Sequence, residues 1–389
     1  MTTAPTPGLH LAVALDGTGW HPASWREPGA RADELFTGGF WVDQVREAEA
    51  GLLDLVTFED SFAIDSDRPD RVQGRLDAQL IALRVGPVTS HIGLVPTVVT
   101  THTEPFHVST EIATLDFATE GRAGVRVKVS SKPDEYALFG RREYGTEDRE
   151  SLFDEAADHI EVQRRLWDSW EDDAEIRDAA TGRFVDREKL HYIDFSGAHF
   201  SVRGPSITPR PPQGQPVVTA LAHVDVAYRL AARGTDLVFV TPGGVGRDGP
   251  TGDAGAILRQ VRAEEAAVGR EGDPLHVLGD LLVVLDDSAD AARARLARLD
   301  ETDGGELRSD ARILTGTVAD VADVLESWHG AGLAGARLRP AVTSTDLPRI
   351  TRELVPELRR RGLFRTAYGA HTLRGHFGLA RPADRYARA

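Results

Sequence analysis

The amino-acid sequence predicts a closed (β/α)8 TIM barrel with insertions after several strands. Short segments rich in aliphatic and β-branched residues alternate with longer amphipathic segments, which is typical of repeated βαβ units. The chain has 389 residues, a length at which such barrels often form one domain. Eight strands with helices between them favour the barrel. An open doubly wound sheet would give the same local alternation, and the count of strands does not exclude it.

The predicted strands are short apolar runs bounded by residues that favour turns. Four of them precede residue 131, and the other four follow residue 215. They span residues 9–16, 53–59, 92–100, 123–130, 216–222, 236–241, 275–285 and 335–341.

Three helices are well marked by their apolar spacing and end signals. Residues 152–170 carry apolar side chains three and four positions apart, so they predict an amphipathic helix. Residues 347–361 end before Gly362, a suitable C-terminal cap, with three arginines in the last turn. Residues 317–331 follow a candidate N-cap at Thr315 or Thr317.

Three segments exceed a minimal barrel. Residues 131–150 form a charged connection, residues 172–215 resemble an extended hairpin plus an irregular crossing, and residues 242–253 are rich in glycine. Long loops that follow barrel strands often carry function, so each segment is a candidate lid. Surface decoration is the alternative for each of them.

The composition argues against several classes of function. There is no cysteine, which excludes disulfides, thiolate metal sites and cysteine nucleophiles. The formal net charge of −16 argues against a nucleic-acid partner. No run of about 18 apolar residues predicts a membrane span, and the first residues lack the pattern of a signal peptide. We therefore expect a cytoplasmic protein without a membrane or nucleic-acid partner.

Two motifs suggest chemistry that their context does not support. His102 and His107 are five residues apart, so they do not share a helix face, and we predict no metal site. Residues 244–249, GVGRDG, match a dinucleotide-binding fingerprint and follow a predicted strand. Because Pro250 and further glycines delay the next helix to about Asp253, a mobile loop is the preferred interpretation.

Several longer stretches resemble one family, the luciferase-like flavin monooxygenases, in the branch of the nitrilotriacetate and dibenzothiophene-sulfone monooxygenases. The main stretch is IGLVPTVVTTHTEPFHVSTEIATLDFATEGRAGVRVKVS at residues 92–130. The others are RRLWDSWEDDA, DFSGAHFSVRGPSITPRPPQGQPVV, LAARGTDLVFV and LVPELRRRGLFRTAY, at residues 164–174, 194–218, 230–240 and 354–368.

The resemblance implies one luciferase-like barrel domain over residues 1–389. It also implies an enzyme that uses reduced FMN and O2 on a small organic substrate. The resemblance further implies that a separate NAD(P)H:flavin reductase supplies the reduced flavin; no reductase motif is recognised in this chain. Relatives often pair through barrel helices, so a homodimer or homotetramer is expected.

The resemblance also implies that residues at the carboxyl ends of the strands surround the flavin ring. The second strand ends in Glu59, Asp60 and Ser61, and the third in a run of threonines and His102. We expect His102 to act as a polariser or proton donor; a structural histidine is the alternative. Asp60 could instead cap a helix, and the threonines could be ordinary strand residues. The candidate ring-binding residues are Asp60, Thr97, Thr100 and Thr101.

At the phosphate end of the flavin the sequence departs from the family pattern. Val125 and Arg126 replace a Trp-Asn pair, Phe153 and Glu155 replace Tyr and Arg, and residues 221–224 replace a Gly-Ser turn. Each lost charge-assisted hydrogen bond would cost roughly 1.5–3 kcal/mol, so losing two or three without replacement would weaken binding about a thousandfold. Arg126, Lys128 and His223 are cations that could replace the lost donors; the alternative is that they are unrelated surface charges. The further candidate cofactor-binding residues at this end are Ser130, Phe153 and Ala222.

Two other functions stay open at this point. The deazaflavin F420 binds to enzymes that share this barrel, and the sequence does not separate it from FMN. The altered phosphate end also allows a non-catalytic paralogue that has lost flavin binding. The identity of the substrate depends on pocket shape, which the sequence does not reveal.

Overall fold

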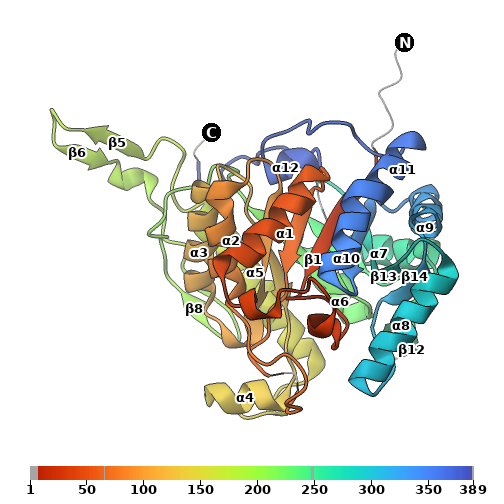
Figure 1. The fold of residues 1–389 in the computed structure, drawn as a ribbon. Helices are drawn as coiled ribbons and strands as arrows, with labels where there is room; N and C mark the ends of the chain where they lie inside the picture. The colour runs from red at the N-terminus through yellow and green to blue at the C-terminus, as the bar shows by residue number, and fades with distance from the viewer. Residues whose placement is uncertain (1–7, 65, 247–248, 271, 388–389) are drawn as a thin grey trace.

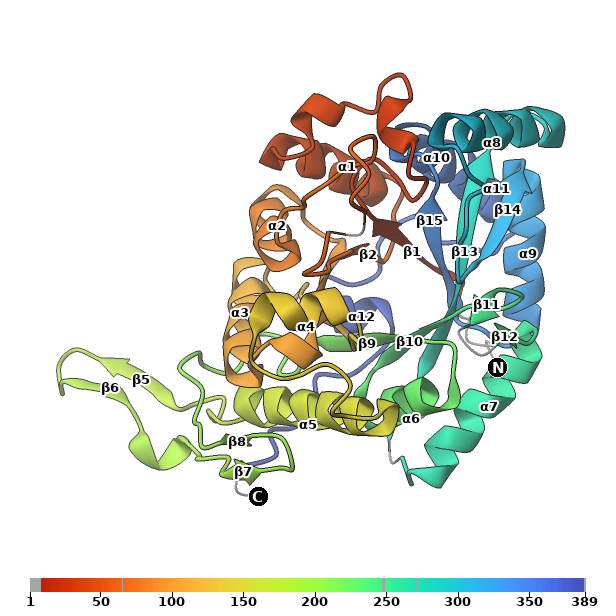
Figure 2. The ribbon, with the colours of Figure 1, turned by 90° about the horizontal axis from the view of Figure 1, so that it is seen from below.

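A computed structural model describes residues 8–64, 66–246, 249–270 and 272–387, and its centre is a closed parallel barrel (Figures 1 and 2). The barrel closes where β10 pairs with β13, with Leu237 opposite His276. All eight predicted strands and the predicted fold are confirmed. In barrel order the strands are β1 (His10–Leu15), β2 (Leu55–Phe58), β3 (Gly93–Val99), β4 (Gly124–Lys128), β9 (Val217–Ala222), β10 (Leu237–Val240), β13 (His276–Leu285) and β15 (Gly335–Pro340).

One further strand in the main sheet was not predicted. β14 (Arg312–Gly316) pairs in parallel with residues 281–285 of β13, outside the closed barrel. β13 has ten residues, and its pairing with β10 reaches only Gly279. The second half of β13 therefore offers a free edge that β14 occupies.

Helices cover the outside of the barrel (Figure 2). The predicted helix at residues 152–170 is α5, which starts earlier because Asp148 caps it; α9 begins at a capping box formed by Thr317 and Asp320. The predicted helix at residues 347–361 is α10, a π-helical turn (Ile350–Leu354) and α11 in succession. The covering helices are α1 (Gly38–Ala50), α2 (Ala78–Val85), α3 (Pro105–Ala118), α5 (Arg149–Trp167), α6 (Asp225–Gly234), α7 (Ala254–Ala267), α8 (Ala289–Asp303), α9 (Val318–Gly330), α10 (Thr343–Arg349) and α11 (Val355–Arg360).

The amino-terminal end of the barrel is closed by apolar side chains. Leu373 of α12 (Leu373–His376) and Phe377 pack among inward-facing residues of the strands. Gly93 makes room for this plug, because a Cβ there would lie 2.3 Å from Cδ1 of Leu373. The ring of Phe377 stacks on His10, with 4.3 Å between centroids. The strand residues in this layer include Ala12, Leu55, Val95, Val217, Leu237 and Leu278.

The three predicted insertions lie at different places. Residues 131–150 follow β4 and contain α4 (Pro133–Phe139); residues 242–253 follow β10 and contain the short strands β11 (Val245–Gly246) and β12 (Gly249–Pro250). Residues 247–248 of the GVGRDG motif lie outside the described residues. α7 begins after the N-cap Asp253, as expected. Both segments therefore lie at the carboxyl ends of the strands.

Residues 172–215 instead connect a helix to a strand. They run from α5 to β9, which places them at the amino-terminal end of the barrel, and Figure 1 shows the β5–β6 hairpin far from α4. That position does not suit a lid over a site at the carboxyl ends. The segment forms two hairpins, of β5 (Glu175–Asp178) with β6 (Arg183–Val185) and of β7 (Phe195–Ser196) with β8 (Ser201–Val202).

Short 3-10 turns complete the described elements. They are Ser24–Arg26, Ala32–Glu34, Gly86–Val88, Thr100–His102 and Arg187–Lys189. Within the described ranges, every helix is too short or too polar to cross a bilayer.

The packing of Phe377 at the amino-terminal end of the barrel predicts that its ring contributes to the stability of the fold. Phe377→Ala removes a buried ring, so it should lower the free energy of unfolding by about 3 kcal/mol, as measured by urea denaturation. The exposed Phe184, on the distal hairpin, gives the matched control: Phe184→Ala should change stability by less than about 0.5 kcal/mol. Equal losses of stability in the two variants would contradict the packing role of Phe377.

Candidate active site

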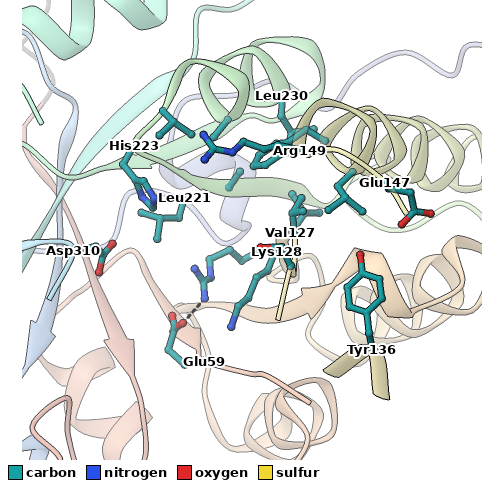
Figure 3. A pocket seen from close by; sticks show the side chains of 18 of the residues that line it. Glu59, Val127, Lys128, Tyr136, Glu147, Arg149, Leu221, His223, Leu230 and Asp310 are labelled. Carbon is teal, nitrogen blue, oxygen red and sulfur yellow. Dashed lines mark hydrogen bonds and ion pairs between the residues drawn. The ribbon is translucent and has the colours of Figure 1, made fainter. Parts of the chain in front are cut away.

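A cavity of about 560 Å³ opens at the carboxyl ends of the barrel strands, and we call it the first cavity (Figure 3). Its walls come from the ends of β4 and β9, from the starts of α5 and α6, and from residues 131–150. The volume lies within the roughly 300–1,000 Å³ of small-molecule and cofactor sites. Ligands of parallel α/β barrels bind at this end, because the loops after the strands converge there.

The floor of the first cavity is a set of paired charges inside the barrel. Glu59, just after β2, accepts a hydrogen bond from Arg126 of β4, and Nη1 of Arg337 on β15 lies 3.3 Å from its other oxygen. Burial opposes ionisation of Glu59, but the charges of Arg126 and Arg337 lower its pKa below the usual value. Figure 3 marks the pair that Glu59 forms with a dashed line.

The same network continues to the far side of the barrel. Nε of Arg337 donates to Asp280 at 2.8 Å, and Nε of Arg339 donates to the same carboxylate at 2.9 Å. Nη1 of Arg339 also donates to Asp310 at 2.6 Å. Buried charges of this kind are tolerated only when they are paired, so the floor is rigid and electrically balanced.

Arg126 lies on this floor, where its guanidinium is already engaged. Besides Glu59, it contacts Thr97, whose hydroxyl accepts a hydrogen bond from Nε at 3.0 Å. Burial lowers the pKa of Arg126 to about 10. Arg126 therefore lies in the floor of the site, whereas Thr97 is buried, does not line the first cavity and contacts the site only through Arg126.

Lys128, His223 and Phe153, three of the candidate cofactor-binding residues, line the first cavity. Nζ of Lys128 donates to the backbone oxygen of Asp60 at 2.7 Å, and burial lowers its pKa. Nδ1 of His223 is buried and has no hydrogen-bond partner among the described residues. Both groups therefore offer polar contacts to a ligand.

The other predicted hydroxyls hold the backbone instead of the cavity wall. The hydroxyl of Thr100 donates to the carbonyl of Lys128 at 3.2 Å, and that of Thr101 accepts from the amide of Ser130 at 3.0 Å. These bonds join the turn after β3 to the end of β4. Ala222 is fully buried beneath the surface of the site. None of these four side chains is among those that line the first cavity.

His102 lies under α4, outside the walls of the first cavity. Its ring stacks on Phe139, with centroids 4.8 Å apart, and its Nε2 lies 3.9 Å from Oε2 of Glu135. Burial lowers the pKa of His102. This position supports the structural alternative for His102 more than the catalytic one.

Asp60 fits the alternative of a capping carboxylate. One oxygen accepts from the amide of Ala78 at 2.9 Å, beside the start of α2, and the other from the amide of Ser61 at 2.7 Å. Burial raises the pKa of Asp60. Its side chain lines a neighbouring cavity, not the first one.

Most residues of the first cavity were not among the sequence candidates, and only some of them left a signal in the sequence. Arg339 belongs to the pattern Arg-x-Arg in an otherwise apolar strand, which could have indicated a charged layer. Tyr136 and Arg149 come from a segment predicted as a lid. Trp20 and Asp310 have no recognisable motif, because the fold alone brings them to the cavity.

One group of side chains has the spacing of a metal site. Ligand atoms of Glu147, Glu155 and His199 lie within 4.8 Å of one another. The guanidinium of Arg142 binds both carboxylates, at 2.6 Å and 2.7 Å from the oxygens of Glu155 and 3.2 Å from Glu147. The guanidinium therefore already offsets part of the negative charge of this group.

The comparison with known families agrees with this architecture. Residues 18–336 match the family described as "Luciferase-like monooxygenase". The chain belongs to this family. The predicted family and enzyme class, an oxidoreductase of the luciferase-like type, are thereby confirmed.

Three relatives align over nearly their whole lengths. N-acetyl-S-(2-succino)cysteine monooxygenase of Bacillus subtilis (strain 168) is 29% identical, over 99% of this chain and 100% of its own. Component A of nitrilotriacetate monooxygenase from Aminobacter aminovorans is 30% identical, over 98% of each chain. Dibenzothiophene-sulfone monooxygenase of Rhodococcus erythropolis is 27% identical, over 92% of this chain and 93% of its own. The predicted branch of the family is also confirmed.

Two solved structures share the fold. A long-chain alkane monooxygenase superposes with a TM-score of 0.84 at 22% identity, covering 96% of each chain. A riboflavin lyase, solved with modified FMN and riboflavin, gives 0.80 at 23% identity, covering 94% of this chain and 95% of its own.

The paired floor predicts an acid-sensitive component of stability. Burial opposes ionisation of Asp310, but Arg339 lowers its pKa from 3.8 to about 2. Ionised Asp310 therefore stabilises the fold above pH 4, and this contribution disappears as the pH falls towards 2. Because the side chain is 31% exposed, we expect about 1–2 kcal/mol at pH 7.

Urea unfolding between pH 2 and pH 7 measures this contribution. Asp310→Asn should flatten the fall in stability below pH 4, whereas Asp290→Asn, at a side chain that is 92% exposed, should leave the profile unchanged. A wild-type profile retained by Asp310→Asn would disprove the assignment.

Proposed function

We propose that the protein is the oxygenase component of a two-component monooxygenase, with reduced FMN as the cofactor of the first cavity. The observation that carries the proposal is the arrangement of that cavity. Arg149 and His223 line it near the starts of α5 and α6, Lys128 lines it beside the end of β2, and the paired charges form its floor. Figure 3 shows Arg149 and Lys128 on different sides of the hollow. A long anion with a polar ring at one end suits this distribution.

The start of α6 supports the phosphate end of the proposal. His223 and Val224 directly precede the helix, whose first amides attract anions. Asp225 in the first turn opposes an anion, but its carboxylate accepts a hydrogen bond from Gln260. Arg149 of α5 lines both the first cavity and the hollow in front of α6. His223 and Arg149 thus replace the hydroxyls that the sequence lacks here.

The floor of the cavity and the wall beside it support the ring of the flavin. Trp20 and Leu221 supply apolar surface, and Glu59 and Arg126 supply polar atoms on the floor. Reduced flavin supplies the oxygen activation, whereas the protein binds it, orients it and excludes water. Tyr136 and Tyr144, from residues 131–150, line the same cavity, which supports a lid role for that segment.

The reducing equivalents come from outside this chain in our proposal. One relative is named as component A of a monooxygenase, which supports a separate NAD(P)H:flavin reductase as the partner. The homodimer or homotetramer expected from the sequence stays a prediction, which sedimentation of the purified protein tests.

FMN binding tests the proposed cofactor. Titration of FMN into the protein should give micromolar affinity, and Lys128→Met should weaken it roughly tenfold or more, because it removes one charge-assisted contact. Lys189→Met is the matched control, since Lys189 pairs with Asp173 on the distal insertion. His223→Ala should weaken binding in the same direction as Lys128→Met.

Each other result points to a different function. Tighter binding of F420 than of FMN would identify F420 as the cofactor and reject the oxygenase proposal. Failure of both cofactors to bind, oxidised or reduced, would favour the non-catalytic paralogue. Equal FMN affinity in Lys128→Met and Lys189→Met would reject the placement of the cofactor.

Dependence on a reductase gives a separate prediction. NADH and FMN alone should support no oxygenation, whereas adding any active flavin reductase should start it, because reduced FMN can diffuse between the two proteins. Product formation measured by mass spectrometry with ¹⁸O-labelled O2 reports the activity. Oxygenation with NADH in the absence of a reductase would contradict the two-component proposal.

A further inference from the structure

A second cavity of about 490 Å³ lies beside the first one. It is lined by residues from 16–36, after β1, and from 59–64 and 66–77, after β2. Trp20 and Glu59 line both cavities, so the two spaces meet at these side chains. Neither of the enclosing segments was predicted as an insertion.

The wall of the second cavity gathers apolar side chains that are unusually exposed. Phe36 is 54% exposed, Phe62 is 38%, Ile64 is 61% and Val72 is 41%. Single exposed apolar residues are ordinary, but a concave group of them marks a binding site. Trp20 and Trp41 add two indole rings to the same wall.

Trp20 is held in place by several contacts where the two cavities meet. Its indole N–H donates to the carbonyl of Ala14 at 2.9 Å, and the guanidinium of Arg339 lies 4.5 Å from its ring centre. Its backbone amide donates to the carbonyl of Pro340 at 2.9 Å. Gly19 permits this approach, since its φ is +141° and a Cβ would lie 2.3 Å from the carbonyl oxygen of Ala341.

The polar groups of the second cavity are largely engaged by other protein groups. The guanidinium of Arg71 donates hydrogen bonds to both carboxylate oxygens of Asp303, at 3.0 Å and 2.6 Å. Asp77 caps α2 through the amide of Leu80. Arg75 faces Asp16, 4.0 Å away.

The acidic side chains therefore outnumber the cations in this space. Glu59 is paired with Arg126 and Arg337, but Asp16, Asp60 and Asp77 also line the cavity, and the arginines among its described lining residues are Arg71 and Arg75. A polyanionic ligand would meet repulsion, since both of these arginines already face a carboxylate.

We propose that the second cavity is the substrate site, and that its substrate is an uncharged, planar aromatic molecule. This rests on the proposed function, which places the flavin in the first cavity, and the two cavities meet at Trp20 and Glu59. Aromatic rings pack favourably on one another beyond the area that they bury, and the acidic rim disfavours anions. The second cavity would therefore not bind a polycarboxylate such as nitrilotriacetate.

Calorimetry with matched ligands tests the substrate class. Naphthamide should bind at least tenfold more tightly than naphthoate, which has the same shape and a negative charge. It should also bind more tightly than decalin carboxamide, which is neutral but not planar. Nitrilotriacetate should show no binding. Equal or tighter binding of naphthoate or nitrilotriacetate would overturn the proposal.

Two substitutions locate the binding site. Phe36→Ala and Ile64→Ser change exposed side chains, so the fold should persist, and each should weaken naphthamide binding roughly tenfold, equivalent to about 1.4 kcal/mol. Ile207→Ser is the control, because Ile207 is 72% exposed on the distal insertion. Unchanged naphthamide affinity in both cavity variants would overturn the location.

FMN titration of the same variants separates this inference from the proposed function. FMN affinity should stay unchanged in all three variants, because the first cavity does not contain their side chains. Selective naphthamide binding without any FMN binding would overturn the proposed function and the substrate role. Normal FMN binding without naphthamide selectivity would overturn only the present inference.

Discussion

The network of paired charges inside the barrel is the constraint on which the site depends. Arg126, Arg337 and Arg339 face Glu59, Asp280 and Asp310 across the barrel interior. Removing one partner of a buried pair leaves an uncompensated charge, which typically costs 3–5 kcal/mol. The network is balanced, so it closes the floor without leaving an excess charge. The lining cations near α5 and α6 then determine where an anionic group is favoured.

The barrel could be predicted because its strands are buried on both faces. Such strands form continuous apolar runs, and each of the eight runs in this chain became one barrel strand. β14 was missed because its position depends on the length of β13, which extends beyond the strand beside it. Residues 172–215 were misplaced for a related reason. Their composition resembles a loop at either end of the barrel, and only their order between a helix and a strand decides which end they occupy.

The site could be predicted in part, for a reason that lies in strand geometry. Side chains of a strand alternate between its two faces, so Arg126 and Lys128 both turn inward from β4. The alternation ends where the strand ends. Thr100, Thr101 and His102 lie in a 3-10 turn after β3, so their hydroxyls and imidazole face backbone groups and α4 instead of the cavity. Sequence position at a strand end therefore identified a neighbourhood but not an orientation.

The unpredicted residue Trp20 connects the two cavities, and its position shows why the loops after β1 and β2 matter. The segment at residues 19–21 hydrogen-bonds to the end of β15, which adds an aromatic wall to the barrel mouth. Arg339 contacts that ring from below and pairs with Asp280 and Asp310 on its other side. The wall is therefore anchored to the charged floor. A change in the charge network would alter both cavities at once. Trp20 lines both of them, and its ring rests on the guanidinium of Arg339, which belongs to that network.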